Sequence, residues 1–487
     1  MRAIYSIILL SLLATLPASA IAEIPASMQK SLDLQLEKNS QRYGVVGQSV
    51  LILKNHKFLY KGQYGFANFE LDVAINSKHL FPSYSVTKLF TSVLIMQQVE
   101  NGTIELHGSI RKYLPYLPIH WQEVTVEHLL SHTSGIPRYI DTAIKSNHFL
   151  ASKKAVFLSL VDEPEHFEIG TTNSYNNTNF LLLAAILEAK TAKTYQQLIA
   201  EVIITPLGLK NTGHASAKTI IKNMVTSYQG ANGTIRRNID IDWPEYTFAH
   251  SALYSTPEDL TTFMTAIVTG KFVSKETLTK LWQPMKLTNG KDGRYAFGFE
   301  YSLEDGYQHA GHDGGNRVKL RHYFNPQNPA DNYTIAYLTN GNAYDVWTDV
   351  LAESVMSIVA PAEFELAALK EQFISAIFDK NSENLNQVFN RLPTIFNGEQ
   401  SSIERFIIYR AYGLKYGSGA ESSILAFEFL TSKYPNSANA QESLADTWAE
   451  IGNTEKAIES YKLVLKIAPK STRAMQQIEL LESAIQK

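Results

Sequence analysis

Apolar runs of two kinds appear early in the chain. Those at residues 48–53 and 57–60 are short and flank a polar turn, a pattern that predicts a β-hairpin. The run at residues 86–99 is longer and is followed by Asn101 and Gly102, which predicts a helix that ends there. One face of that helix is formed by apolar residues at helical spacing, namely Val86, Leu89, Phe90, Val93 and Leu94.

The same two patterns recur further along the chain. Helical spacing is found at residues 180–187, 195–204 and 344–359, and strand-like runs at residues 317–324 and 333–339. A hairpin near the start of this region and strands near its end, with helices between them, indicate one sheet built from both ends of the segment. We therefore predict an α+β domain at residues 23–361 rather than alternating β–α–β units.

The pattern becomes purely helical at residue 362. Residues 362–403 are expected to form a helical linker. In residues 404–487, Pro435 and Pro469 are about 34 residues apart, which resembles the period of tetratricopeptide repeats. This resemblance implies a small α-helical repeat domain that binds a protein partner or the substrate; the alternative is an unrelated pair of helical hairpins. Because about three units are needed for a stable stack, the linker helices are expected to complete it.

The first residues predict export. A single positive charge at Arg2 is followed by an apolar run and then by small residues in A-x-A spacing. This pattern is typical of a signal peptide, here residues 1–22, cleaved after Ala20 or Ala22. A membrane anchor is the weaker alternative, because the run is shorter than the ~18 apolar residues that span a bilayer. The mature protein is expected to be periplasmic or secreted, without a stable membrane anchor.

Composition excludes several classes of function. The chain has 487 residues, with 44 basic and 47 acidic side chains and a formal net charge of −3. It shows no basic stripe of the kind that binds nucleic acid, so no nucleic-acid partner is expected. It contains no cysteine, which excludes disulfides, a thiol nucleophile and thiolate metal sites.

A serine–lysine pair is the first candidate for chemistry. A serine nucleophile needs a nearby base and donors for the oxyanion, and in S-x-x-K at a helix start the lysine shares a face with the hydroxyl. The G-x-S-x-G elbow of ordinary α/β-hydrolases is absent. Of the S-x-x-K matches, only Ser85…Lys88 joins a strand-like segment to a long apolar helix; the others are Ser27…Lys30 and Ser109…Lys112.

Two further polar motifs are candidates for the same site. Of three Y-x-N matches, the one that begins at Tyr175 and ends at Asn177 follows a polar loop and opens a helix-like run. H-x-G occurs twice in succession, beginning at His309 and at His312. Glycines such as Gly311 allow a strand to approach a ligand closely.

Together these residues resemble the serine β-lactamase and penicillin-binding-protein superfamily, in the branch of class C β-lactamases, D,D-peptidases and esterases. The resemblance covers residues 30–360 and depends on the order and spacing of short motifs. It implies an antiparallel sheet flanked by helices, with an inserted helical subdomain. The motifs lie at residues 81–88, 127–137, 174–177, 206–212, 254–260, 295–299 and 309–311.

The resemblance implies a role for each matching group. Ser85 would be the acylated nucleophile, and Lys88 and Tyr175 would share proton transfer, with either as the acylation base. Tyr175 would also activate the deacylating water, while Asn177 would orient Lys88 and bind the substrate amide. The backbone N–H groups of Ser85 and His312 would form the oxyanion hole. The implied reaction is two-step acyl transfer on D-amino-acid peptides or small acyl amides and esters.

One motif departs from the family pattern. The sequence has no K-T-G, and His309 is expected to replace the lysine, a choice over His312 that depends on Tyr307 upstream and Gly311 downstream. A histidine is only partly charged near neutral pH, so it is a weaker anchor for a substrate carboxylate. Hydrolase chemistry is still expected. The alternatives are a β-lactamase proper, or a catalytically weak penicillin-binding or scaffold protein that works through its repeats.

No cofactor or metal is expected. His128 and His132 have the spacing of two ligands on a helix, but the glutamate of H-E-x-x-H is missing, which favours structural roles. His309, His312 and Asp313 are flanked by glycines that suit a strand lining a substrate site better than a metal centre.

Overall fold

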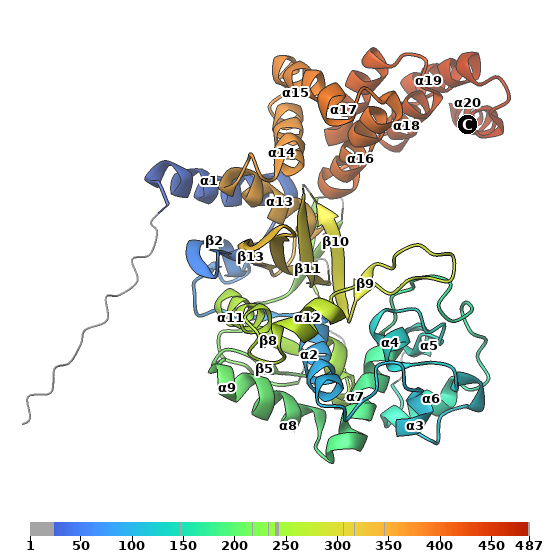
Figure 1. The fold of residues 1–487 in the computed structure, drawn as a ribbon. Helices are drawn as coiled ribbons and strands as arrows, with labels where there is room; N and C mark the ends of the chain where they lie inside the picture. Colours follow the sequence, from blue (N-terminus) through green and yellow to red (C-terminus); the bar gives the residue numbers. More distant parts are fainter. Residues whose placement is uncertain are drawn as a thin grey trace, which may run out of the picture.

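The computed structural model describes most of the chain, in a sheet-centred body and an extended helical region (Figure 1). The predicted signal peptide at residues 1–22 lies outside the described residues. Within the described part, no helix is long and apolar enough to cross a membrane. The description covers residues 24–485, except residues 147–148, 217, 232, 239–242, 305, 316 and 345.

In the described part of the chain, an eight-stranded antiparallel sheet forms the centre of the larger body. Its strand order, β3-β2-β1-β13-β12-β11-β10-β9, joins the start of this body to its end at the β1–β13 pair, where Val50 lies opposite Tyr337. The strands are β1 (Gly47–Lys54), β2 (Lys57–Asn68), β3 (Val73–Ala74), β9 (Tyr295–Ala296), β10 (Phe299–Glu304), β11 (Tyr307–Gly314), β12 (Val318–Asn325) and β13 (Asn328–Thr339). The predicted hairpin and closing strands are confirmed.

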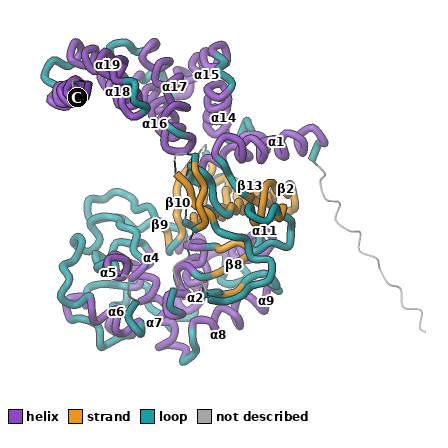
Figure 2. The backbone as a smooth tube through the Cα atoms, turned by 180° about the vertical axis from the view of Figure 1, so that it is seen from behind, coloured by secondary structure: helices purple, strands orange, loops and turns teal. Residues whose placement is uncertain are grey.

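Helices and two small sheets fill the chain between β3 and β9, and further helices flank the large sheet (Figure 2). The small sheets are β4 (Phe81–Pro82), β8 (Leu253–Ser255) and β5 (Gly213–His214), and β6 (Tyr228–Ala231) with β7 (Thr234–Arg237). The helices of this body are α1 (Ala26–Tyr43), α2 (Thr87–Glu100), α3 (Ile110–Tyr113), α4 (Val126–Leu130), α5 (Tyr139–Ser146), α6 (Lys153–Ser159), α7 (Asn177–Thr191), α8 (Tyr195–Ile199), α9 (Thr205–Leu207), α10 (Phe248–Ser251), α11 (Pro257–Val268), α12 (Lys275–Leu281) and α13 (Thr348–Val359).

Different helices bury the two faces of the sheet, because neighbouring residues of a strand point to opposite sides. Val318 and Leu320 of β12 are buried in the large apolar core that also contains residues of α2, α7 and α11. Tyr323 of the same strand and Tyr337 of β13 belong to a second core with residues of α1 and α13. The predicted α+β architecture, a sheet flanked by helices with an inserted helical subdomain, is confirmed.

The helical region shares one apolar core from Leu369 to Ala474. The segment predicted as a linker therefore packs with the helices that follow it, and the predicted boundary at 403–404 falls inside a helix, because the apolar positions run through it. The repeat assignment itself stays a prediction. The helices are α14 (Glu365–Phe378), α15 (Ser382–Ile395), α16 (Gln400–Ser418), α17 (Ala420–Lys433), α18 (Ala438–Glu450), α19 (Thr454–Ile467) and α20 (Thr472–Ile485).

The helical region is attached to the larger body through α1 and α13. Arg42 of α1 forms a buried ion pair with Glu371 of α14, at 2.6 Å. Beside it, the rings of Tyr43 and Phe378 meet edge to face, with centroids 6.4 Å apart. These contacts lie on the face of the sheet that α1 and α13 cover, away from the large core. We call this face the outer face.

Candidate active site

Ser85 and Lys88 lie on one face of a single helical segment. A short 3₁₀ turn, Tyr84–Val86, runs directly into α2, so residues three positions apart stand one above the other. Lys88 Nζ is 3.2 Å from Ser85 Oγ. Tyr84 has a positive φ of 43°, a strained backbone for a bulky residue, at the turn that presents the serine.

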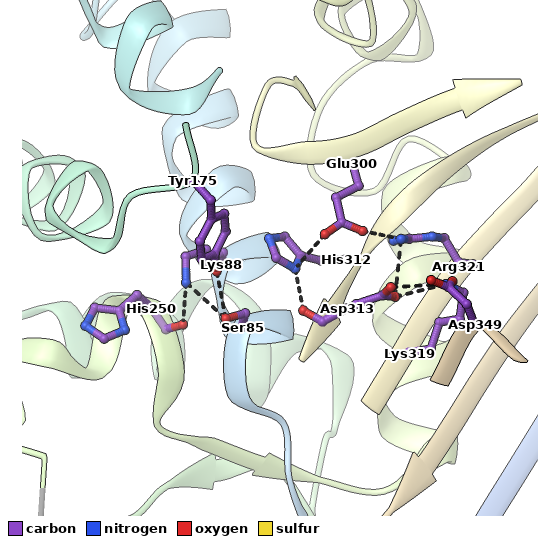
Figure 3. A network of polar contacts seen from close by, with 10 residues as sticks. All are labelled: Ser85, Lys88, Tyr175, His250, Glu300, His312, Asp313, Lys319, Arg321 and Asp349. Carbon is purple, nitrogen blue, oxygen red and sulfur yellow. Dashed lines mark hydrogen bonds and ion pairs between the residues drawn. The ribbon is translucent and has the colours of Figure 1, made fainter. Parts of the chain in front are cut away.

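Tyr175 reaches the same hydroxyl from a distant part of the chain. It lies in the loop before α7, and its phenol donates a hydrogen bond of 2.7 Å to Ser85 Oγ. His132 packs against its ring at 4.7 Å and accepts a hydrogen bond from the Asn176 N–H, which fixes the loop. Figure 3 shows Ser85, Lys88 and Tyr175 directed toward one another.

Lys88 is fully buried, and its second hydrogen bond goes to the backbone. Nζ donates to the carbonyl oxygen of His250, at 2.9 Å. Burial lowers the pKa of Lys88 well below its usual value, and the Glu300 carboxylate opposes this only in part. A buried amine with a lowered pKa is a proton acceptor, and such groups are concentrated at functional sites.

The tyrosine is held in its neutral form. Burial raises the pKa of Tyr175 well above its usual value, although the hydrogen bond to Ser85 acts in the opposite direction. A neutral phenol is a hydrogen-bond donor, in agreement with its contact to Ser85 Oγ. The site therefore combines an amine of lowered pKa and a phenol of raised pKa around one hydroxyl.

Asn177 differs from one part of its expected role, the orientation of Lys88, while its contact to the substrate amide stays a prediction. Its Oδ1 is buried and has no hydrogen-bond partner among the described residues, so it does not hold Lys88. The carbonyl of His250 holds the amine instead. Sequence reasoning missed this contact because a backbone carbonyl leaves no trace in the residue type.

The two histidines of β11 lie on opposite faces of the sheet, because they are three residues apart. The ring of His312 lies 5.8 Å from that of Tyr175, at the site. His309 instead contacts Ser302 Oγ through Nε2 at 2.6 Å and the ring of Tyr323 on the outer face. The expectation that His309 takes the place of the K-T-G lysine is therefore corrected in favour of His312.

The glycines of β11 serve close packing. A Cβ at Gly311 would collide with the carbonyl oxygen of Leu320, so the packing of the sheet requires this glycine, and its substrate contact stays a prediction. A Cβ at Gly314 would lie 2.6 Å from the carbonyl oxygen of Ser83. The end of β11 therefore lies directly against the turn that carries Ser85.

Charged side chains from three strands continue the site toward the outer face (Figure 3). Glu300 of β10 forms an ion pair with Arg321 of β12, and Arg321 Nη2 is 3.2 Å from Asp313 Oδ1. Lys319 Nζ is 3.1 Å from the same Asp313 oxygen and also contacts Asp349. A cavity of about 370 Å³ adjoins this network and is lined by all five residues.

The metal alternatives receive no support from the geometry. His128 belongs to the capping box of α4, where its Nδ1 accepts from the Thr125 N–H, and His132 packs against Tyr175. Among residues 24–485, apart from the gaps given above, no group of three or more histidine, aspartate or glutamate side chains is arranged to hold a metal ion.

The fold and the site place the chain among proteins built like serine hydrolases. Residues 27–354 match the Beta-lactamase family, and the chain belongs to that family, which includes amidases, esterases and penicillin-binding proteins. A stretch of 331 residues is 25% identical to penicillin-binding protein 4* of Bacillus subtilis (strain 168), covering 64% of this chain and 72% of that protein. Another match, of 192 residues, is 30% identical to protein flp of Staphylococcus aureus (strain MW2) and covers 38% of each chain.

A solved structure shares the fold. D-amino acid amidase from Ochrobactrum anthropi SV3 aligns with a TM-score of 0.58 at 19% identity, covering 69% of this chain and 99% of that one.

Proposed function

We propose that this protein is an exported serine hydrolase that acts on amides or esters through an acyl-Ser85 intermediate. The observation that carries the proposal is the convergence of two groups on one hydroxyl. Ser85 Oγ lies 3.2 Å from Lys88 Nζ and 2.7 Å from the Tyr175 phenol. A nucleophilic serine needs such a neighbouring acceptor and a way to return the proton to the leaving group.

In the acylation step, neutral Lys88 takes the Ser85 proton as the oxygen attacks the substrate carbonyl. The lowered pKa of Lys88 and the raised pKa of Tyr175 favour the amine as this base. The N–H groups at the start of the Ser85 helix and at the end of β11 are the proposed oxyanion donors. The leaving group departs with the proton, and water then hydrolyses the ester with Tyr175 as its base.

The proposed substrates are D-amino-acid peptides or small acyl amides and esters. At the position expected for a cationic anchor stands His312, whose pKa burial lowers to about 4, so the ring is neutral near pH 7. A neutral ring beside the ionised Glu300 gives little attraction to a substrate carboxylate. This favours amidase or esterase activity, of the kind that the name of the Ochrobactrum enzyme describes, over efficient β-lactamase activity.

Export and partner binding complete the proposal. The sequence of residues 1–22 supports secretion or a periplasmic location. The helical region packs on the outer face of the sheet through Arg42 and Glu371. We assign it a role in docking a protein partner, with its helices stacked as tetratricopeptide-like repeats.

The direct test is labelling with a fluorophosphonate, followed by mass spectrometry of peptides. The expected result is one covalent adduct on Ser85 and none in Ser85→Ala. Labelling that persists in Ser85→Ala would overturn the assignment. Rapid nitrocefin turnover would favour the β-lactamase alternative, and slow acylation by penicillin without ester turnover would favour a penicillin-binding scaffold.

A further inference from the structure

The neighbours of His312 define which of its nitrogens carries the proton. Nδ1 lies 2.6 Å from the backbone carbonyl oxygen of Asp313 and 3.6 Å from Glu300 Oε1. A carbonyl and a carboxylate only accept hydrogen bonds, so the proton must be on Nδ1. The neutral ring therefore holds a lone pair on Nε2.

That Nε2 is buried and has no hydrogen-bond partner among the described residues. The His312 side chain as a whole is 2% exposed. Figure 3 shows this nitrogen on the side of the ring that faces Tyr175 and Lys88. A buried acceptor without a donor costs free energy, so its place next to a phenol that exchanges protons calls for a functional reason.

Glu300 is fixed behind the ring as an anion. Burial opposes its ionisation, but the Arg321 guanidinium, with His312 and Lys319, holds the pKa of Glu300 below its usual range. Arg321 is itself buried between Glu300 and Asp313. A carboxylate beside Nδ1–H fixes the ring orientation and stabilises an imidazolium once Nε2 accepts a proton.

We propose that Glu300 is a positioning residue that holds His312 as the proton acceptor of Tyr175 during deacylation. The inference rests on the proposed acyl-Ser85 function. Water loses a proton to the Tyr175 oxygen as its own oxygen bonds to the acyl carbon, and the phenol proton passes to His312 Nε2. When the tetrahedral intermediate collapses, the bond to Ser85 Oγ breaks and the proton returns to that oxygen through Tyr175.

Several titratable groups surround His312 and enter the pH dependence. They are Lys88 of α2, His132 after α4, Tyr175 before α7, Glu300 of β10, Asp313 of β11 and Arg321 of β12, and Tyr295 of β9 packs against Tyr175 in turn. The Glu300 anion favours the protonated ring, so removing it lowers the pKa of His312 further. Deacylation needs the neutral ring, so its rate falls at acidic pH as the ring becomes protonated. Without Glu300, this acidic limb of the pH–rate profile therefore moves to lower pH.

The test is burst kinetics with p-nitrophenyl acetate, in which the burst reports acylation and the steady state reports deacylation. For Glu300→Gln, the burst rate is expected to stay within about threefold of the wild type, while the steady state slows roughly tenfold to a hundredfold. The midpoint of the acidic limb moves down. The exposed Glu276→Gln makes the same chemical change away from the site and is expected to leave both phases unchanged. Glu300→Asp keeps the carboxylate and is expected to return the midpoint of the acidic limb part of the way to its wild-type pH.

His312→Gln separates the histidine from Lys88, whose pKa also responds to Glu300. Glutamine does not titrate, so the acidic limb of deacylation is expected to disappear. A limb that persists in His312→Gln, or equal losses of burst and steady state in a folded Glu300→Gln, would overturn the inference. If Glu300→Gln does not fold by circular dichroism, His312→Gln carries the test. A wild type with neither burst nor acyl-Ser85 would instead contradict the proposed function itself.

Discussion

The Ser85 site and the helical region differ in the kind of polar groups that they bury. In the site, Lys88 is fully buried as an amine, and His312 Nε2 has no partner among the described residues. In the helical region, buried hydroxyls such as Ser423 and Thr447 donate to carbonyls of their own helices. Lys415 is paired with Glu450, Ser418 Oγ is an exception without a partner among the described residues, and most of that core is apolar, with residues such as Leu430 fully buried.

The difference indicates which region is organised for catalysis and which for stability. Partly satisfied polar groups lower stability, and proteins retain them where they change protonation state or contact a substrate. A region whose buried groups are mostly apolar or paired within the region is organised for rigid packing. Substitutions in the first region should therefore change turnover, and those in the second should change stability.

The largest effect is expected for Ser85→Ala. Removal of the nucleophile should reduce ester turnover by about a thousandfold or more, because the remaining groups have no oxygen to acylate. Initial rates with p-nitrophenyl acetate measure this. The matched control is Ser109→Ala, another serine of an S-x-x-K match. It caps α3 and should cost about 1 kcal/mol of stability with turnover intact.

Lys88→Met should reduce turnover by roughly a hundredfold or more, because it removes the proton acceptor. The fold should be kept or stabilised, since methionine fills the site without a buried amine. Burial lowers the pKa of Lys88, so the neutral amine is present at lower pH than for an exposed lysine. Acylation in the wild type should therefore increase as pH rises through this lowered pKa. Acylation with an unchanged pH profile in Lys88→Met would contradict the role of the amine.

His312→Lys should change acylation by penicillin by about tenfold. A cation at this position attracts the substrate carboxylate, which the neutral histidine does not. The rate of covalent labelling by penicillin, followed by intact-protein mass, is expected to increase. His309→Lys is the matched control on the outer face of the same strand and should leave the labelling rate unchanged. Equal increases in both variants would contradict the assignment of His312, and not His309, to the face that binds the substrate.

The smallest change in turnover is expected for Leu430→Ala, in the helical region. Truncation of this fully buried side chain should cost about 2–5 kcal/mol of unfolding free energy for that region. Ester turnover should stay within about twofold of the wild type. Denaturant unfolding and initial rates check the two parts. A large loss of turnover in the folded variant would mean that the helical region contributes to the site.

The sequence predicted those features that depend on local spacing. The β1–β2 hairpin follows from two short apolar runs around a turn, and Ser85 and Lys88 meet because three residues make almost one helical turn. The role of Tyr175 beside Ser85 could be assigned only through family resemblance, since nothing local joins the two residues. The closing strands were found from their apolar runs.

The remaining features depend on pairing between distant segments. The choice between His309 and His312 depends on which face of β11 each side chain occupies. The pairing of β11 with β10 and β12 decides this. Glu300 and Arg321 lie on different strands, and no local pattern joins them. The boundary after residue 403 was misplaced because helix-prone residues continue through it, so composition does not mark where one helix ends.

The most direct test is to trap the intermediate during turnover. The protein is mixed with p-nitrophenyl acetate and quenched in acid within the burst. Its peptides are then analysed by mass spectrometry. We expect a transient acetyl group on Ser85 that decays at the steady-state rate. Turnover of the ester with no acyl group on Ser85 at any time would contradict the proposed mechanism.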